Sequence, residues 1–203
     1  MNNAQSVPIP SGTSKMRQRV LMLGGLGTVG RILQRGLSAE YDVVVSDLPE
    51  EASPVAGRYL RLDITKYEDL VNRVPLGIDA VINLVGLSVK DNIVDAGTLD
   101  QMVCAYVSGV HNVLSASIRL GIKRVILASS NRVTEFYEED GRSSLGREIT
   151  AEDYPRTRST YGALKLCAES LGLVFRNLAA QKHLSIFLTC RRDLALAREE
   201  RIP

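Results

Sequence analysis

A glycine-rich turn near the start of the chain constrains the fold more than any other feature of the sequence. The turn spans Leu23–Gly30, reads LGGLGTVG, and contains both Gly-x-Gly-x-x-Gly and Gly-x-x-Gly-x-x-Gly spacings. An apolar run, Arg19–Leu23, precedes it, and a helical pattern, Thr28–Ser38, follows it. Glycines placed in this way allow a tight turn, close approach of the backbone to a phosphate and close packing of helix on sheet. The sequence therefore predicts a strand, a turn and a helix whose N-terminus faces an anionic ligand.

The alternation of strand and helix continues along the chain. Short apolar runs predict further strands at Asp42–Ser46, Tyr59–Leu62, Ala80–Leu84, Arg124–Ala128 and Ser185–Thr189. Helical patterns occur at Tyr67–Arg73, Leu99–Leu120 and Thr160–Ala180. The strands are too apolar to have an exposed face, and right-handed crossovers between them give a parallel sheet. The predicted fold class is α/β, a Rossmann-like doubly wound parallel sheet of about six strands with helices on both faces.

Length, charge and cysteine content limit the classes of function. The 203 residues predict one dinucleotide-binding domain (18–190), a flexible N-terminal tail (1–17) and a charged C-terminal tail (191–203). A net charge of +2 argues against nucleic acid as a partner, and no apolar run is long enough to span a bilayer. Three widely spaced cysteines form neither a metal-ligand pattern nor a disulfide framework, so we expect no metal and a cytoplasmic location. The polar segment Glu135–Arg156 is expected to be an irregular surface loop.

Two aspartates follow predicted strands on the side of the glycine turn. Asp47 closes the second strand, about 20 residues beyond the turn, where a carboxylate hydrogen-bonds the adenosine ribose. Because that carboxylate would repel a 2′-phosphate, NAD is favoured over NADP. The alternatives are a turn that serves packing alone and a surface or capping role for Asp47. Asp63 follows the third strand, where it suits a contact to adenine or an N-cap of the next helix.

A second group of polar residues lies in the C-terminal half of the chain. Tyr161 and Lys165 are four residues apart at the start of a predicted helix, so they share one helix face. A nearby ammonium favours phenolate over phenol, which makes a tyrosine a usable general base near neutral pH. Ser129 and Ser130 follow the fifth strand, where a serine can hydrogen-bond a reacting hydroxyl or carbonyl. The alternative is that Tyr161 simply packs while Lys165 extends its charge into solvent.

Together these residues resemble the extended short-chain dehydrogenase/reductase family, also called the NAD-dependent epimerase/dehydratases. The resemblance spans roughly Arg19–Thr189 and rests on the glycine turn, both aspartates, Asn83–Gly86, the serine pair and Tyr161-x-x-x-Lys165. It implies an NAD site, whose expected residues are Gly24, Gly27, Thr28, Val29, Gly30, Asp47, Asp63, Ile64, Leu84, Val85, Gly86, Tyr161 and Lys165.

Within that family the chain shows a closer resemblance to uronate dehydrogenases. The similar segments are Gly86–Val89 and Ala128–Arg132 with the Phe136-Tyr137 pair that follows. This resemblance implies an oxidoreductase in which the catalytic residues are Ser130, Tyr161 and Lys165. Tyr161 would remove the proton of a sugar or sugar-acid hydroxyl while hydride leaves for NAD. The residues implied to hold the substrate are Ser88, Ser130 and Asn131, although serine and asparagine are also common in ordinary turns.

The chain departs from the family pattern in several places. Tyr106 stands where an asparagine is usual, Arg132 where histidine is usual, and Glu135 where glycine is usual. Relatives also continue well beyond the sixth strand, whereas here Cys190 leads into the charged tail, so we expect the substrate lobe to be absent. These departures leave two other functions open, a catalytically silent NAD-binding module and a nucleotide-sugar epimerase or dehydratase.

The resemblance also implies a homodimer. Relatives pair the helices that correspond to Leu99–Leu120 and Thr160–Ala180, and here both helices carry apolar residues around their circumference. The alternative is that burial on the sheet accounts for this apolar surface.

Overall fold

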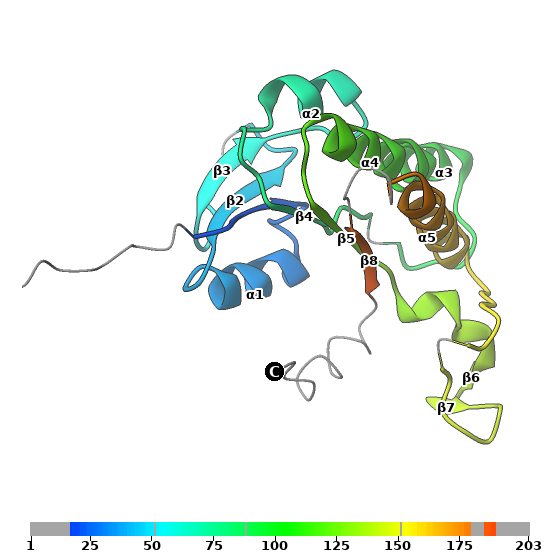
Figure 1. Cartoon of the computed structure of the whole chain (residues 1–203). Coiled ribbons are helices and arrows are strands. Elements are labelled where there is room, and N and C mark those ends of the chain that lie inside the picture. Colours follow the sequence, from blue (N-terminus) through cyan, green and yellow to red (C-terminus); the bar gives the residue numbers. More distant parts are fainter. Residues whose placement is uncertain (1–16, 51, 88, 151, 180–184, 190–203) are drawn as a thin grey trace, which may run out of the picture.

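The computed structural model describes residues 17–50, 52–87, 89–150, 152–179 and 185–189. Its main sheet has six parallel strands in the order β3-β2-β1-β4-β5-β8 (Figure 1). The strands are β1 (Arg19–Leu23), β2 (Asp42–Asp47), β3 (Arg58–Arg61), β4 (Ala80–Asn83), β5 (Arg124–Ala128) and β8 (Ser185–Thr189). The chain builds outward from β1 to β3, then returns across β1 to build the other half from β4. The predicted doubly wound α/β sheet is confirmed, and its order reverses between β1 and β4.

Helices pack on both faces of this sheet. They are α1 (Thr28–Leu37), α2 (Tyr67–Arg73), α3 (Ala96–Val103), α4 (Val110–Arg119) and α5 (Thr160–Ala179). Figure 1 shows α1 on one side of the sheet and α2, α4 and α5 on the other. In the larger core, Leu70 of α2, Leu114 of α4 and Phe175 of α5 pack with alternate residues of the strands. Within the described ranges, every helix is too short or too polar to cross a membrane.

Burial on both faces explains why the interior positions of β1 are all apolar. In β1, Leu21 and Leu23 belong to the core under α2 and α4, whereas Val20 and Met22 belong to the clusters that contact α1. All four are buried. Because successive side chains of a strand point to opposite faces, a strand covered on both sides must be apolar at every position. Each large side chain buried in this way stabilises the fold by about 1.5–3 kcal/mol.

The predicted long helix Leu99–Leu120 is interrupted in the structure. It starts three residues earlier, at Ala96, because the carboxylate of Asp95 accepts a 3.0 Å hydrogen bond from the backbone N–H of Thr98. A π-helical turn, η1 (Cys104–Gly109), then joins α3 to α4. Such turns insert an extra residue into a helix and re-aim the side chains that they carry. Tyr106 lies within this turn.

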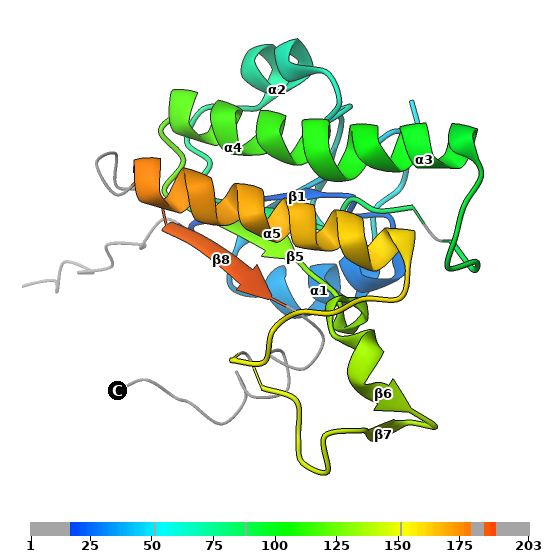
Figure 2. The same cartoon turned by 90° about the vertical axis from the view of Figure 1, so that its right-hand side faces the viewer.

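The segment Glu135–Arg156, expected to be an irregular surface loop, is mostly irregular but contains short regular elements. The segment begins with a 3₁₀ turn, η3 (Glu135–Tyr137), and continues as an antiparallel hairpin of β6 (Glu138–Glu139) and β7 (Arg142–Ser143). Asp140 and Gly141 form its turn with positive φ angles of 47° and 75°. An Asp-Gly pair is the usual sequence signal for a two-residue hairpin turn. Figure 2 shows the hairpin extending away from the helices that cover the sheet.

Several expectations lie outside the described residues. They are the C-terminal tail (191–203), the N-terminal tail apart from Arg17, and Ser88.

Candidate active site

The glycine turn connects β1 to α1 at the carboxyl edge of the sheet. Gly24 has a φ of 71°, and a Cβ there would lie 2.7 Å from the backbone nitrogen of Val85 in the neighbouring strand's loop. A Cβ on Gly30 would overlap the carbonyl oxygen of Gly25. Gly27 is the N-cap of α1, and no side chain caps this helix. The first N–H groups of α1, including those of Thr28 and Val29, therefore suit a phosphate.

A cavity of about 600 Å³ opens beside the turn. It lies at the carboxyl ends of β1 to β4, where the strand order reverses, which is where doubly wound sheets bind their ligands. The predicted cofactor residues that line it are Gly24, Gly27, Asp47, Asp63, Ile64, Leu84, Val85 and Gly86. Residues that the sequence reasoning missed also line it: Leu48, Thr65, Asp100, Gln101, Cys104 and Ala105. The last four come from α3 and η1, whose position over the cavity only the packed fold reveals.

The two aspartates at this edge are held by different contacts. Asp47 accepts hydrogen bonds from the backbone N–H of Leu26 (3.1 Å) and of Leu48 (2.9 Å), so it ties β2 to the glycine turn. Asp63 accepts bonds from the backbone N–H (3.0 Å) and the hydroxyl (2.7 Å) of Thr65. The capping alternative for Asp63 was wrong, because Lys66 occupies the N-cap of α2.

The two serines after β5 make hydrogen bonds to different parts of the structure. The hydroxyl of Ser129 donates to the carboxylate of Glu169 on α5. The hydroxyl of Ser130 accepts a 3.2 Å bond from the backbone N–H of Arg132 and so caps the 3₁₀ turn η2 (Asn131–Val133). Ser129 is therefore committed to the helix, while Ser130 faces the loop.

Lys165 is buried, with 6% of its surface exposed, so the alternative in which its charge extends to solvent was wrong. Its Nζ donates a 2.9 Å hydrogen bond to the carbonyl of Ala128, the last residue of β5. The same Nζ lies 5.8 Å from the centre of the Tyr161 ring. Burial lowers the pKa of Lys165 to about 8, and the carboxylate of Glu169 partly opposes this shift.

Tyr106 fills the space between the cavity and Lys165. It is 1% exposed, and its ring packs edge-to-face on Tyr161 with the ring centres 5.6 Å apart. Its hydroxyl accepts a 2.8 Å bond from the backbone N–H of Leu87 and donates to the carbonyl of the same residue at 3.3 Å. Burial raises the pKa of Tyr106 well above the usual range, so this hydroxyl stays protonated. A Cβ on Gly86 would lie 2.9 Å from it, which explains the need for glycine there.

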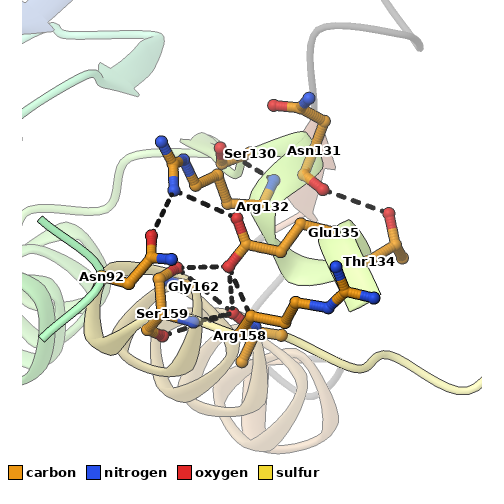
Figure 3. A network of polar contacts seen from close by, with 10 residues as sticks. Asn92, Ser130, Asn131, Arg132, Thr134, Glu135, Arg158, Ser159 and Gly162 are labelled. Carbon is orange, nitrogen blue, oxygen red and sulfur yellow. Dashed lines mark hydrogen bonds and ion pairs between the residues drawn. The ribbon is translucent and has the colours of Figure 1, made fainter. Parts of the chain in front are cut away.

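The two departures in the loop after β5 form one ion pair (Figure 3). Nη1 of Arg132 lies 3.1 Å from Oε2 of Glu135 and 3.1 Å from Oδ1 of Asn92. The other carboxylate oxygen of Glu135 accepts bonds from the hydroxyls of Thr157 and Ser159 and from the backbone N–H of Arg158. Burial by itself raises the pKa of Glu135, but these hydrogen bonds outweigh it and hold that pKa below its usual value.

This network anchors the start of α5. The hydroxyl of Ser159, held by Glu135, accepts a 3.2 Å bond from the backbone N–H of Gly162, next to Tyr161. Gly162 packs so closely on the loop after β5 that a Cβ would lie 2.6 Å from the carbonyl oxygen of Arg132. The side chain of Asn131 points away from the network (Figure 3). Both departures are visible in the sequence, but no sequence signal indicated that they pair.

The fold therefore gathers the predicted residues in two adjoining places. Gly24, Gly27, Gly86 and the two aspartates line the cavity, whereas Gly30 packs on Gly25. Ser130, Tyr161 and Lys165 lie at the end of β5 and the start of α5. Tyr106 and Leu87 link the two. Among the described residues, no group of three or more His, Cys, Asp or Glu side chains could hold a metal ion.

Comparison with known proteins agrees with this geometry. The model of the NAD dependent epimerase/dehydratase family matches residues 20–188. The uncharacterized protein YtbQ of Bacillus subtilis is 38% identical over 158 residues, which are 78% of this chain and 62% of YtbQ. The uronate dehydrogenase of Pseudomonas syringae pv. tomato is 30% identical over 156 residues, which are 75% of this chain and 52% of that enzyme. The chain thus spans between 52% and 62% of the length of these relatives.

A solved structure shares the fold. It is a mutant uronate dehydrogenase from Agrobacterium tumefaciens complexed with NAD, which superposes with a TM-score of 0.68 at 18% identity. The match covers 91% of this chain and 71% of that one.

Proposed function

The chain belongs to the NAD dependent epimerase/dehydratase family, and on that premise we propose that it is an NAD-dependent oxidoreductase that oxidises a hydroxyl of a sugar or sugar acid. The observation that carries the proposal is the buried Lys165. Its ammonium is fixed to the end of β5 and lies beside Tyr161, away from bulk water. Burying a cation costs free energy, so a buried lysine beside a tyrosine indicates a functional site. Here the ammonium of Lys165 can support Tyr161 as a reacting group.

The residues around the cavity fit an NAD molecule. At Gly24 and Gly30 the backbone approaches its neighbours too closely for any side chain, and the uncapped start of α1 offers N–H donors to the pyrophosphate. Asp47 lies at the cavity wall, where its carboxylate suits the ribose hydroxyls and disfavours a 2′-phosphate. When bound, NAD supplies the hydride acceptor.

The chain's own residues would handle the proton. Tyr161 takes the proton of the substrate hydroxyl as the carbon that bears it loses hydride and becomes a carbonyl. The ammonium of Lys165 stabilises the phenolate form of Tyr161 that can do this. Ser130, which is not committed to α5 as Ser129 is, holds the reacting oxygen.

The names of the relatives support a sugar acid as substrate. The proteins similar to this chain include uronate dehydrogenases. The loop after β5, with Ser130 and Asn131, resembles the active-site loop of that group. Ser88, Ser130 and Asn131 are the proposed substrate contacts.

Absorbance of NADH tests this function directly. Purified protein with NAD and galacturonate or glucuronate is expected to form NADH, and Tyr161→Phe is expected to abolish turnover while NAD binding persists. Undiminished turnover in Tyr161→Phe would contradict the mechanism. NAD binding by a folded protein without turnover on any sugar would favour a silent NAD-binding module, and product formation without net NADH would favour an epimerase.

A further inference from the structure

Tyr106 occupies a place from which it can act on both halves of the site. It lies in the π-helical turn η1, between α3 and α4. Figure 2 shows this long helix running alongside α5, the helix that carries Tyr161 and Lys165. Tyr106 also stands where the family usually has an asparagine.

The ring of Tyr106 faces the ammonium of Lys165. Nζ lies 4.8 Å from the ring centre, nearer than it lies to the ring of Tyr161 at 5.8 Å. Both distances are within the range of a cation–π attraction, which is strongest when the cation is shielded from water, as it is here. The other polar groups described around Nζ are the carbonyl of Ala128 on β5 and the carboxylate of Glu169 on α5.

Glu169 is itself engaged by the hydroxyl of Ser129, so it does not serve Lys165 alone. Ala128 and Glu169 interact with Lys165 from β5 and α5. On η1, the group that stabilises the charged form of Lys165 is the ring of Tyr106. Burial works in the opposite direction and lowers the pKa of this lysine to about 8.

The hydroxyl of Tyr106 faces the cavity wall. It binds both the N–H and the carbonyl of Leu87, and it lies against Gly86. Both residues line the cavity in which the dinucleotide is proposed to bind. One side chain thus touches the wall of the cavity at its tip and the catalytic lysine on its face.

We propose that Tyr106 is a positioning residue that holds the ammonium of Lys165 on its ring and the Gly86–Leu87 backbone on its hydroxyl. This arrangement keeps Lys165 charged and the cavity wall in place at the same time. The consequence for catalysis rests on the proposed oxidoreductase function, whereas the two contacts themselves do not.

The ring contact is tested by phenylalanine analogues at position 106 with none, one and three ring fluorines. Fluorine weakens the negative face of the ring with little change of shape, so folding is preserved. The pKa of Lys165 is read by NMR of protein with ¹³Cε-labelled lysine, the signal being assigned among six lysines with Lys165→Arg. It is expected to fall stepwise along the series, by about one unit in total. A constant pKa across the series would overturn the ring contact.

The hydroxyl contact is tested by Tyr106→Phe, which keeps the ring. Several-fold weaker NAD binding, measured by fluorescence titration, with an unchanged pKa of Lys165 is expected. Wild-type affinity for NAD in this variant would overturn the hydroxyl contact.

Catalysis gives a third readout. As the pKa of Lys165 falls along the fluorinated series, the ammonium supports the phenolate of Tyr161 less, so the acid limb of kcat/KM against pH is expected to move to higher pH. A fixed limb would contradict the positioning role. If the wild-type protein turns over no substrate, the proposed function fails, while the NMR and binding results still decide the role of Tyr106.

Discussion

Asp47 binds the backbone N–H of Leu26 at 3.1 Å, so the residue proposed to contact the ribose also holds the glycine turn. Its charge and its hydrogen-bonding capacity can be separated. Asp47→Asn keeps an acceptor oxygen for the turn but loses the negative charge, so the ratio of NADP to NAD affinity is expected to rise about tenfold. Asp47→Ala loses both and is expected to weaken both cofactors. Fluorescence titration with each dinucleotide measures this, and an unchanged ratio in Asp47→Asn would show that the carboxylate does not exclude a 2′-phosphate.

Burial of the charged Lys165 is expected to make the protein less stable than a variant with an apolar residue at this position. Because its pKa falls from 10.5 to about 8 on folding, the unfolded chain binds more protons between these pH values. Stability therefore rises with pH across this window. Lys165→Met is expected to unfold at higher urea concentration at pH 7, with a gain of about 1–3 kcal/mol and a flatter dependence on pH, while turnover is lost.

Lys123→Met is the matched control, because Lys123 is exposed. This control is expected to leave the pH dependence of unfolding unchanged. A Lys165→Met protein that is less stable than wild type at pH 7 would show that the contacts of Nζ outweigh its burial.

The Arg132–Glu135 pair is expected to stabilise the start of α5. Glu135→Gln removes the charge that receives four donors and is expected to lower the free energy of unfolding by about 1–3 kcal/mol and to reduce kcat. Since folding depresses the pKa of Glu135, its contribution is present above the ordinary glutamate pKa and is lost as pH falls through the folded value.

A double-mutant cycle with Arg132→Gln isolates the pair, and a coupling of about 0.5–1 kcal/mol is expected. Glu139→Gln is the control, since the Glu139 side chain is 70% exposed and lies 3.9 Å from Arg158. Equal losses in Glu135→Gln and Glu139→Gln would contradict a special role for Glu135.

The rate at which Cys104 is alkylated is expected to show whether the cavity is occupied. This free cysteine lines the cavity and is exposed, whereas Cys167 is exposed on α5 and does not line it. NAD at ten times its Kd is expected to slow alkylation of Cys104 about tenfold by mass action and to leave Cys167 unaffected. Peptide mass spectrometry after timed iodoacetamide treatment gives both rates in one sample. Equal protection of both cysteines would indicate general tightening rather than a ligand in this cavity.

The homodimer expected from the family resemblance remains a proposal, supported by exposed apolar residues on both helices. They are Leu99 and Val103 on α3, and Leu173 and Val174 on α5. Val174→Lys is expected to shift sedimentation from dimer to monomer. Leu76→Lys, at an exposed apolar residue outside these helices, is expected to have no effect. A monomeric wild type at high concentration would refute the pairing.

Local sequence determined much of this protein. The predicted limits of β1, β5, β8 and α2 coincide with the structure, and the glycine turn lies where its spacing placed it. These features depend on neighbours within a few residues, since runs that must be buried on both faces are apolar and positive φ angles favour glycine. The Asp140-Gly141 turn carried the same kind of signal, although the hairpin was not predicted from it.

Tertiary structure decided the contacts between distant segments. Arg132 contacts Asn92 and Lys165 contacts Ala128 across separations of 40 and 37 residues. Tyr106, in the π-helical turn η1, contacts Leu87 across 19 residues. No local pattern encodes such pairings, because they form when elements that are each stabilised by their own periodicity are brought together by burial of a common core. The sequence by itself therefore determined the elements and the residue types of the site, and the packing of α3, η1 and α5 on the sheet decided which of them touch.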